Sequence, residues 1–176
     1  MTERQAVVQV GVPNDVSVTK ALAAAGNYAA GDVVSESASA GTTWNWANVV
    51  KTNGGHGFIT KATALLETTA LTPRFTVFLF DTDPTSAVTN DNVANTAPLH
   101  ADAATFVGAI EFPAMKSLGT GDSYAVAQPG SSSLLPLEFK CASGDRDLYA
   151  IVATRDAITG ETATDDLIIV LTIRED

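Results

Sequence analysis

Short β-prone segments recur along the chain, and clusters of Gly, Pro, Asn, Asp and Ser separate them. This spacing is typical of a sandwich or barrel, and strands do not alternate with long helices. The expected strands are Ala6–Val12, Ser17–Leu22, Asp32–Ser35, Thr43–Lys51, Gly57–Leu66, Arg74–Phe80, Thr105–Glu111, Ser123–Ala127, Leu137–Cys141, Asp147–Ala153 and Leu167–Arg174. The sequence therefore predicts an all-β fold with little helix, a jelly-roll-like β-sandwich of two antiparallel sheets.

Three of these segments, Arg74–Phe80, Asp147–Ala153 and Leu167–Arg174, carry apolar side chains at both odd and even positions. Successive residues of a strand point to opposite faces of a sheet, so such strands pack on both sides. We expect these three to lie in the middle of their sheets and to form the core.

Turn residues suggest how neighbouring strands are joined. The sequence NGGHG, Asn53–Gly57, accepts positive φ angles and predicts a hairpin between Thr43–Lys51 and Phe58–Leu66. The Ala-rich stretch Val18–Ala30 could form one turn of helix, but Gly26 argues against a longer one.

The length of 176 residues suits one domain, or one domain with an arm. Residues 1–15 are interpreted as an N-terminal arm or edge strand, and residues 16–176 as the β-sandwich domain. The arm contains Val7, Val8 and Val10, which are candidate partner-binding residues because a β-prone arm can add to the sheet of another subunit.

Composition limits the classes of partner. Ten Lys and Arg against 20 Asp and Glu give a net charge of −10, the wrong sign for binding nucleic acid over a broad face. The single cysteine, Cys141, cannot form an internal disulfide. No basic segment precedes a long apolar run and no stretch approaches ~20 apolar residues, so we expect no signal peptide or membrane contact, and synthesis in the cytoplasm.

No catalytic motif is present. The chain lacks a nucleophile elbow, a phosphate-binding loop, a dinucleotide-binding glycine pattern and a zinc-binding His-Glu-x-x-His motif. His56 and His100 lie in turn-rich segments and are interpreted as solvated loop residues. We therefore expect a protein that is not an enzyme and has no cofactor.

The segment DTDPTSAVTNDN follows an apolar strand and contains hard oxygen donors of the kind that Ca²⁺ prefers: Asp81, Asp83, Asp91 and Asn92. Its spacing does not fit an EF-hand, because Pro84 follows Asp83 and no Glu closes the loop. The favoured interpretation is that these residues form turns, with a structural cation as the alternative.

Two short segments supply further candidate contact residues. Trp44 and Trp46 are two residues apart and therefore share one face of a strand, which fits either an aromatic platform for a sugar or partner protein, or the core. Leu134 and Leu135 end a flexible connection and are candidate partner-binding residues.

Five segments together resemble a family of structural proteins of tailed bacteriophages. They are AAGDVVS (29–35), NGGHGFITKATAL (53–65), TPRFTVFLFDTDPT (72–85), Asp91–Asn92 and FVGAIEF (106–112). Similarity to capsid decoration, or cement, proteins implies a jelly-roll-like sandwich on the exterior of the virion. It also implies binding to the major capsid protein as a homo-oligomer, commonly a trimer.

Two alternatives stay open at the level of the sequence. A carbohydrate-binding β-sandwich or adhesin requires Trp44 and Trp46 to be exposed on a concave sheet. A phage tail or head–tail joining component would use the Thr43–Leu66 pair as a hairpin in a tube wall. The leading hypothesis is a non-enzymatic decoration protein that stabilises a phage head.

Overall fold

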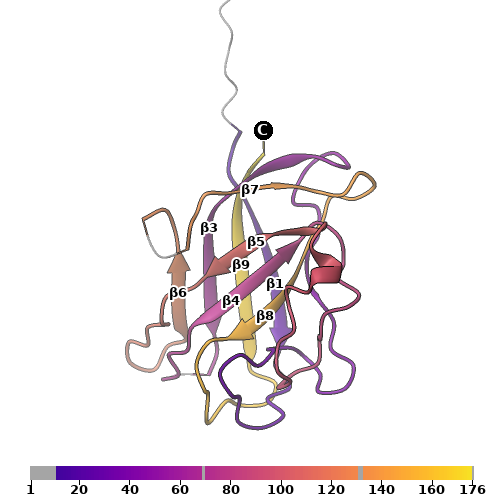
Figure 1. Ribbon diagram of the computed structural model, residues 1–176. Helices are drawn as coiled ribbons and strands as arrows, with labels where there is room; N and C mark the ends of the chain where they lie inside the picture. The colour runs from indigo at the N-terminus through magenta and orange to yellow at the C-terminus, as the bar shows by residue number, and fades with distance from the viewer. Residues whose placement is uncertain (1–10, 69, 131–132, 176) are drawn as a thin grey trace, which may run out of the picture.

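The computed structural model describes residues 11–68, 70–130 and 133–175, which form two antiparallel sheets packed face to face (Figure 1). The all-β sandwich expected from the sequence is confirmed. Helical structure in these residues is limited to a 3-10 turn, η1 (His100–Asp102). The strands are β1 (Asn14–Ala21), β2 (Trp44–Trp46), β3 (His56–Leu66), β4 (Phe75–Phe80), β5 (Phe106–Glu111), β6 (Ser123–Ala127), β7 (Leu137–Lys140), β8 (Leu148–Thr154) and β9 (Asp166–Glu175).

The order of the strands follows the jelly-roll pattern. The first sheet has the order β1-β9-β3-β6, and β7 also pairs with β3, while the second sheet has the order β2-β8-β4-β5. Because β6 and β7 pair with successive halves of β3, they act as one interrupted strand. The chain is then a long antiparallel ribbon with the β4–β5 pair at its tip, and successive strand pairs fall alternately into the two sheets.

The core fills the space between the sheets. In β4, Phe75, Val77 and Leu79 point inward and are at most 1% exposed. Leu167, Ile169, Leu171 and Ile173 of β9 face them from the first sheet. The three segments expected in mid-sheet correspond to β4, β8 and β9, and each pairs with a strand on both sides. Their central position is therefore confirmed.

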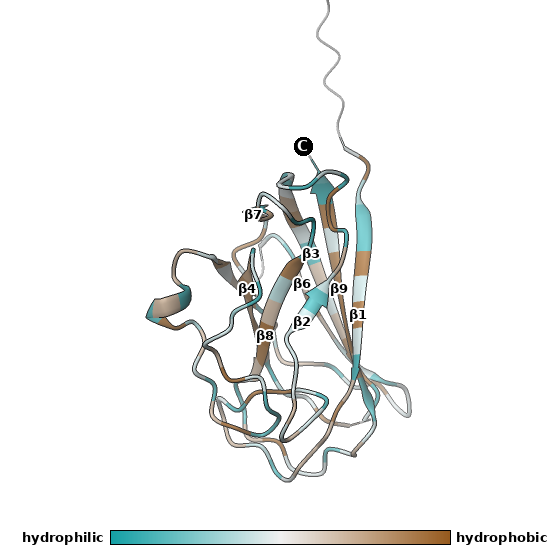
Figure 2. Cartoon of the chain, turned by 90° about the vertical axis from the view of Figure 1, so that its right-hand side faces the viewer, coloured by the Kyte–Doolittle hydropathy of each residue, from teal (hydrophilic) through white to brown (hydrophobic). Residues whose placement is uncertain are grey.

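The outer side of the second sheet carries a smaller core. Phe80 and Ile151 lie on this side and pack with Val33 from the β1–β2 connection and Ala97 from the β4–β5 connection. Phe80 also contacts Phe106, with ring centroids 5.5 Å apart. The connection between β4 and β5 thus lies over this face, as the left side of Figure 2 shows.

The predicted hairpin is wrong. The turn at Asn53–Gly57 exists and Gly54 has a φ of 69°, but β2 pairs with β8 while β3 pairs with β6, β7 and β9. The expected strand Thr43–Lys51 shortens to the three residues of β2, because Asn48 has a φ of 57° in the turn that follows. A tight turn sets the direction of the chain but does not decide which sheet the next strand joins.

Two other local expectations also differ from the structure. Asp32–Ser35 makes isolated bridges at Asp32 and Val33 instead of a strand. The Ala-rich stretch Val18–Ala30 contains no helical turn, since β1 continues to Ala21. Tertiary pairing outweighs the helix propensity of alanine here.

The N-terminal arm lies mostly outside the described residues, including the expected strand Ala6–Val12 up to residue 10. The range 1–15 ends inside β1, because Asn14 and Asp15 pair with Ile173 and Thr172. β1 is an edge strand of the first sheet. Just before it, a Cβ at Gly11 would lie 2.2 Å from the carbonyl oxygen of Glu175, so the described ends of the chain are side by side.

Candidate functional site

A buried carboxylate holds together the long connections at one end of the sandwich. Asp91 is 1% exposed. It accepts hydrogen bonds from the Tyr28 hydroxyl at 2.9 Å, the Ser35 amide at 2.8 Å and the Ala25 amide at 3.2 Å. Burial, together with the charge of Asp91, raises the pKa of Tyr28 well above its usual value of 10, so the phenol stays a donor. Asp91 therefore acts as a structural anchor between these connections.

The four candidate cation ligands do not form one site. Asp81 follows β4 and accepts a hydrogen bond from the Thr82 hydroxyl, whereas Asp83 is exposed. Asp91 is saturated by its protein donors, and Asn92 has a φ of 56° in a turn. Within the three described segments, no group of three or more His, Cys, Asp and Glu residues is placed to hold a metal ion. The turn interpretation fits these positions better than the cation interpretation.

The aromatic platform expected as one alternative is wrong. Trp44 and Trp46 are 1% and 0% exposed, and their rings stack within the core at a centroid distance of 6.3 Å. Their indole N–H groups donate to the carbonyl oxygens of Val34 and Ile169, both at 3.1 Å. Burial of these large rings, with both donors satisfied, removes them as contact residues for a glycan or a partner.

The other candidate contact residues divide between surface and interior. Leu134 is 88% exposed and is available to a partner, whereas Leu135 is 7% exposed and belongs to the core. The assignment of Leu135 as a contact residue is therefore wrong. Val7, Val8 and Val10 lie outside the described residues.

A second polar cluster ties β1 to the connection that follows it. The Lys20 ammonium group is 2.5 Å from the Glu36 carboxylate and donates to the carbonyl oxygen of Thr42 at 2.6 Å. It also lies 5.5 Å above the ring of Trp44. Burial alone would raise the pKa of Glu36, but hydrogen bonds from Lys20, Thr42 and Ser35 lower it to about 2. Glu36 is therefore ionised and committed to this cluster.

A third cluster brings two carboxyl groups to one hydroxyl. Thr68 Oγ1 lies 2.6 Å from Glu161 Oε1 and 2.6 Å from Asp165 Oδ2. Burial raises the pKa of Glu161, and the charges of Asp165 and Asp91 add to the effect against opposing hydrogen bonds. Because a hydroxyl has one hydrogen to donate, Thr68 satisfies only one of these two carboxyl groups by donation.

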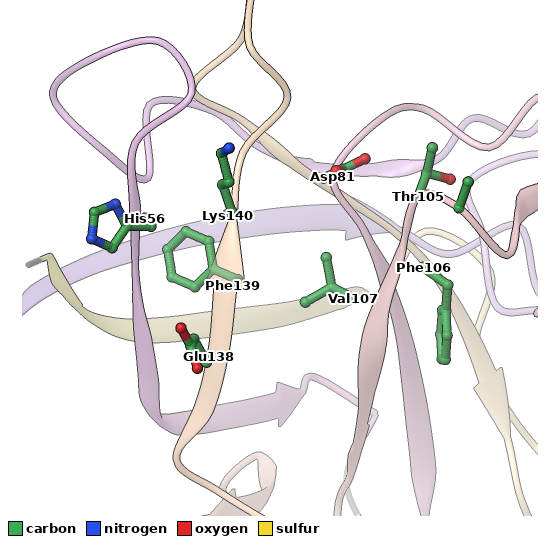
Figure 3. Close-up of a pocket in the computed structure, with 9 residues that line it drawn as sticks. His56, Asp81, Thr105, Phe106, Val107, Glu138, Phe139 and Lys140 are labelled. Carbon is green, nitrogen blue, oxygen red and sulfur yellow. The ribbon is translucent and has the colours of Figure 1, made fainter.

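One cavity opens at the seam between the edge strands β5 and β7 (Figure 3). Its volume is about 420 Å³, and its lining includes His56, Asp81, Glu138 and Lys140 together with apolar side chains. In Figure 3, Glu138 and Lys140 flank Phe139 along β7, while His56 and Asp81 come from other segments of the chain. The mixture of charges selects neither an anionic nor a cationic ligand, so the cavity identifies no substrate class.

The single cysteine and the two histidines are further groups capable of nucleophilic or acid–base chemistry. Cys141 is 1% exposed, and burial raises the pKa of its thiol to about 12, so it is protonated near neutral pH. His56 and His100 are exposed, as expected from the sequence, although His56 is the first residue of β3.

Sequence reasoning missed the Lys20–Glu36 and Thr68–Glu161–Asp165 clusters. Lys20 is 16 residues from Glu36, and Thr68 is 93 and 97 residues from Glu161 and Asp165, so these contacts form no short motif and depend on how the chain folds.

None of the helical structure in the described part of the chain is long and apolar enough to cross a membrane. Comparisons with family models, with curated proteins and with solved structures found no match to this chain.

Proposed function

We propose that this chain is a non-enzymatic structural protein of a tailed bacteriophage, which binds the outer surface of the capsid and stabilises the head. The observation that carries the proposal is the order of the strands. A jelly-roll sandwich is the fold that the resemblance to decoration proteins implies, and the two sheets have this order. Three of the resembling segments supply β3, β4 and β5 with their flanking turns.

The distribution of charge supports a place on the outside of a shell. The chain has a net charge of −10 but only 17% charged residues, so its exterior is acidic and sparsely charged. Such a surface repels packaged DNA and suits contact with other protein. Many identical contacts together stabilise a shell even when each contact is modest, because binding favours the assembled state by mass action.

The features needed by the two alternative functions are not those of this fold. The carbohydrate-binding alternative depended on exposed rings at Trp44 and Trp46, which are buried. The tail alternative depended on a hairpin over Thr43–Leu66, whose two halves lie in different sheets. Capsid decoration depends on neither feature.

The direct test is addition of the purified protein to capsids that lack it. We expect saturable binding, a copy number on the order of hundreds per particle, and release of DNA at a higher temperature than from bare capsids. Copy numbers in small multiples of six would indicate tail rings instead. Absence of capsid binding together with unchanged release of DNA would contradict the proposal.

A pair of variants tests the one described contact residue. Among the described candidates only Leu134 is exposed, so Leu134→Asp is expected to weaken capsid binding about tenfold. Leu118, which is 79% exposed in another connection, provides the matched control Leu118→Asp. Equal binding by both variants would remove Leu134 from the contact without affecting the capsid role.

A further inference from the structure

The first sheet has an outer face that is apolar and partly exposed. This outer face is the side of β1, β9, β3, β6 and β7 that points away from the second sheet. In β9 the inward residues Leu167, Ile169 and Leu171 are fully buried, while the outward residues Ile168 and Val170 are only partly buried. A strand in the middle of a sheet that is apolar on both sides normally packs on both sides.

The outward side chains form one continuous patch. Leu65 of β3 lies opposite both Ile168 of β9 and Tyr124 of β6. The next outward row has Thr63 opposite both Val170 and Val126. Side chains directly opposite each other in antiparallel strands are in contact, so two adjacent rows make a patch across three strands. These five apolar residues and Thr63 form the centre of the outer face.

No described segment lies over this patch. The connection between β4 and β5 covers the outer side of the second sheet, where Val33 and Ala97 pack against it. In Figure 2 that connection lies on the left, while β9 and β1 lie on the right, where a loop extends beyond them only at their lower end. Tyr124 is 37% exposed, which makes it one of the few exposed large apolar side chains of the described chain.

Charges are arranged asymmetrically around the patch. Its centre carries no charged residue, although the chain has a net charge of −10. At the end of the face beside the C-terminal end of β9, the cations are Lys61, Lys140 and Arg174, and the anions are Asp15 and Glu138. At the opposite end, beside the start of β9, the anions are Glu67, Asp122 and Asp166, and the cation is Lys116. The face therefore has a neutral centre between a mixed end, where cations outnumber anions, and an acidic end.

We infer that the outer face of the first sheet binds the same face of a second copy of this chain, with the two β9 strands running antiparallel across a two-fold axis. The outward positions of β9 are Asp166, Ile168, Val170, Thr172 and Arg174. An axis at Val170 places Asp166 of each copy opposite Arg174 of the other. The arrangement makes the face self-complementary, as a two-fold contact requires.

The charges favour a second copy over other occupants. Two molecules of net charge −10 repel each other through most of their surface, and the neutral centre of this face is where the repulsion is smallest. The outer face measures on the order of 300 Å² when four strands are spaced ~4.8 Å apart and five residues rise ~3.3 Å each. A standard interface buries about 800 Å² per partner, so the dimer is expected to be concentration-dependent.

This contact goes beyond the proposed capsid role and does not depend on it. It also predicts a dimer as the basic unit, whereas the resemblance to decoration proteins implies a trimer. A trimer requires two different patches that meet in a ring, and a single self-complementary face does not supply them.

The test is sedimentation velocity on the full chain over about a hundredfold range of concentration. The wild-type chain is expected to convert from monomer to dimer. Val170→Lys, at the centre of the face, is expected to raise the dissociation constant at least tenfold. Val93→Lys is the matched control, because it places the same charge on an exposed valine in the connection between β4 and β5, which covers the other sheet.

Far-UV circular dichroism and the thermal midpoint establish that each variant is folded. If Val170→Lys does not fold, Thr63→Lys replaces it, since Thr63 is polar and lies in the same outward row. Asp166→Arg and Arg174→Asp are each expected to weaken the dimer about two- to fivefold, and the double variant is expected to restore it.

Three results would overturn the inference. They are a wild-type chain that stays monomeric over the whole range, a trimer, and a dimer that Val170→Lys leaves intact or Val93→Lys disrupts. A monomeric chain whose capsid binding is lost in Val170→Lys would assign the face to the capsid protein instead.

Discussion

The Tyr28 hydroxyl donates a hydrogen bond to the Asp91 carboxylate over 2.9 Å, and this contact joins two connections that are 63 residues apart. One connection leads from β1 to β2 and the other from β4 to β5. Both are long and contain no strand, and their positions are fixed by backbone hydrogen bonds such as that from the Val33 amide to the Val93 carbonyl, together with side-chain contacts such as this one. The buried carboxylate thus holds the two connections against each other.

Tyr28→Phe removes one donor from this carboxylate and leaves its other contacts in place. We expect the free energy of unfolding to fall by about 1–3 kcal/mol, because a buried acceptor loses a partner. Chemical denaturation measures the change. Tyr124→Phe on the exposed edge of β6 is the control and is expected to stay within about 0.5 kcal/mol of wild type. Equal stability of the two variants would show that Asp91 is not the anchor.

The Trp46 indole is predicted to act through packing. Trp46→Phe creates a small cavity and leaves the carbonyl oxygen of Ile169 without its donor, so we expect a loss of about 2–4 kcal/mol. In the wild-type chain, fluorescence of both tryptophans should resist quenching by iodide, since Trp44 and Trp46 are at most 1% exposed. Strong quenching together with a stable variant would contradict the buried position.

Glu36 should make the fold sensitive to acid. Its pKa is lowered to about 2 in the folded chain from the usual 4.5, so it contributes stability above pH 4.5 that is lost as the pH falls toward 2. Glu36→Gln should flatten this part of the stability profile, measured by urea denaturation at each pH. Glu138→Gln on exposed β7 is the control. Parallel profiles for Glu36→Gln and wild type would show that the cluster does not retain the charge.

The contribution of Glu161 to stability should depend on pH in the opposite direction to that of Glu36. Its pKa is raised above 4.5, so the stability from its protonated form is complete at lower pH and is lost as the pH rises through the raised value. Glu161→Gln keeps a neutral hydrogen-bonding group beside Thr68. We expect this variant to be more stable than wild type at neutral pH and similar to it in acid. Lower stability at neutral pH would show that the carboxylate form is the one that the fold requires.

Gly41 tests the packing of two connections. A Cβ at this position would lie 2.1 Å from the carbonyl oxygen of Thr89, and backbone cannot move aside as a flexible side chain would. Gly41→Ala is expected to cost about 1–3 kcal/mol of stability. Gly121→Ala, where no atom lies within 4 Å, should be neutral or slightly stabilising. Thermal unfolding of both variants decides, and equal midpoints would mean that the two connections are not packed this closely.

The sequence predicts strands well where their own residues specify them. The apolar runs at Arg74–Phe80 and Leu167–Arg174 correspond to β4 and β9. A strand that pairs on both sides and buries at least one face contains a run of apolar residues that can be recognised in the sequence. Such an apolar run does not predict how completely other parts of the protein cover the second face of the strand. Ile168 and Val170 have the pattern of buried residues and are partly exposed.

Local sequence patterns did not predict which distant segments pair or contact each other. The turn at Asn53–Gly57 indicates a reversal of the chain, but the jelly roll sends the strands on either side of it into different sheets. The spacing of Trp44 and Trp46 places both rings on one face without telling which face is buried. The Thr68–Glu161 contact spans 93 residues, so it depends on a register that no short motif encodes.

The ribbon-like course of the chain has a consequence for its connectivity. Since β1 and β9 are paired and Gly11 lies against Glu175, the described ends are close enough for a short linker to join them. The chain could then be opened in the connection between β5 and β6, where Leu118 and Gly121 are exposed. Such a circular permutant would keep every strand pair, so the order in which the ribbon is synthesised is separable from the sandwich that it forms.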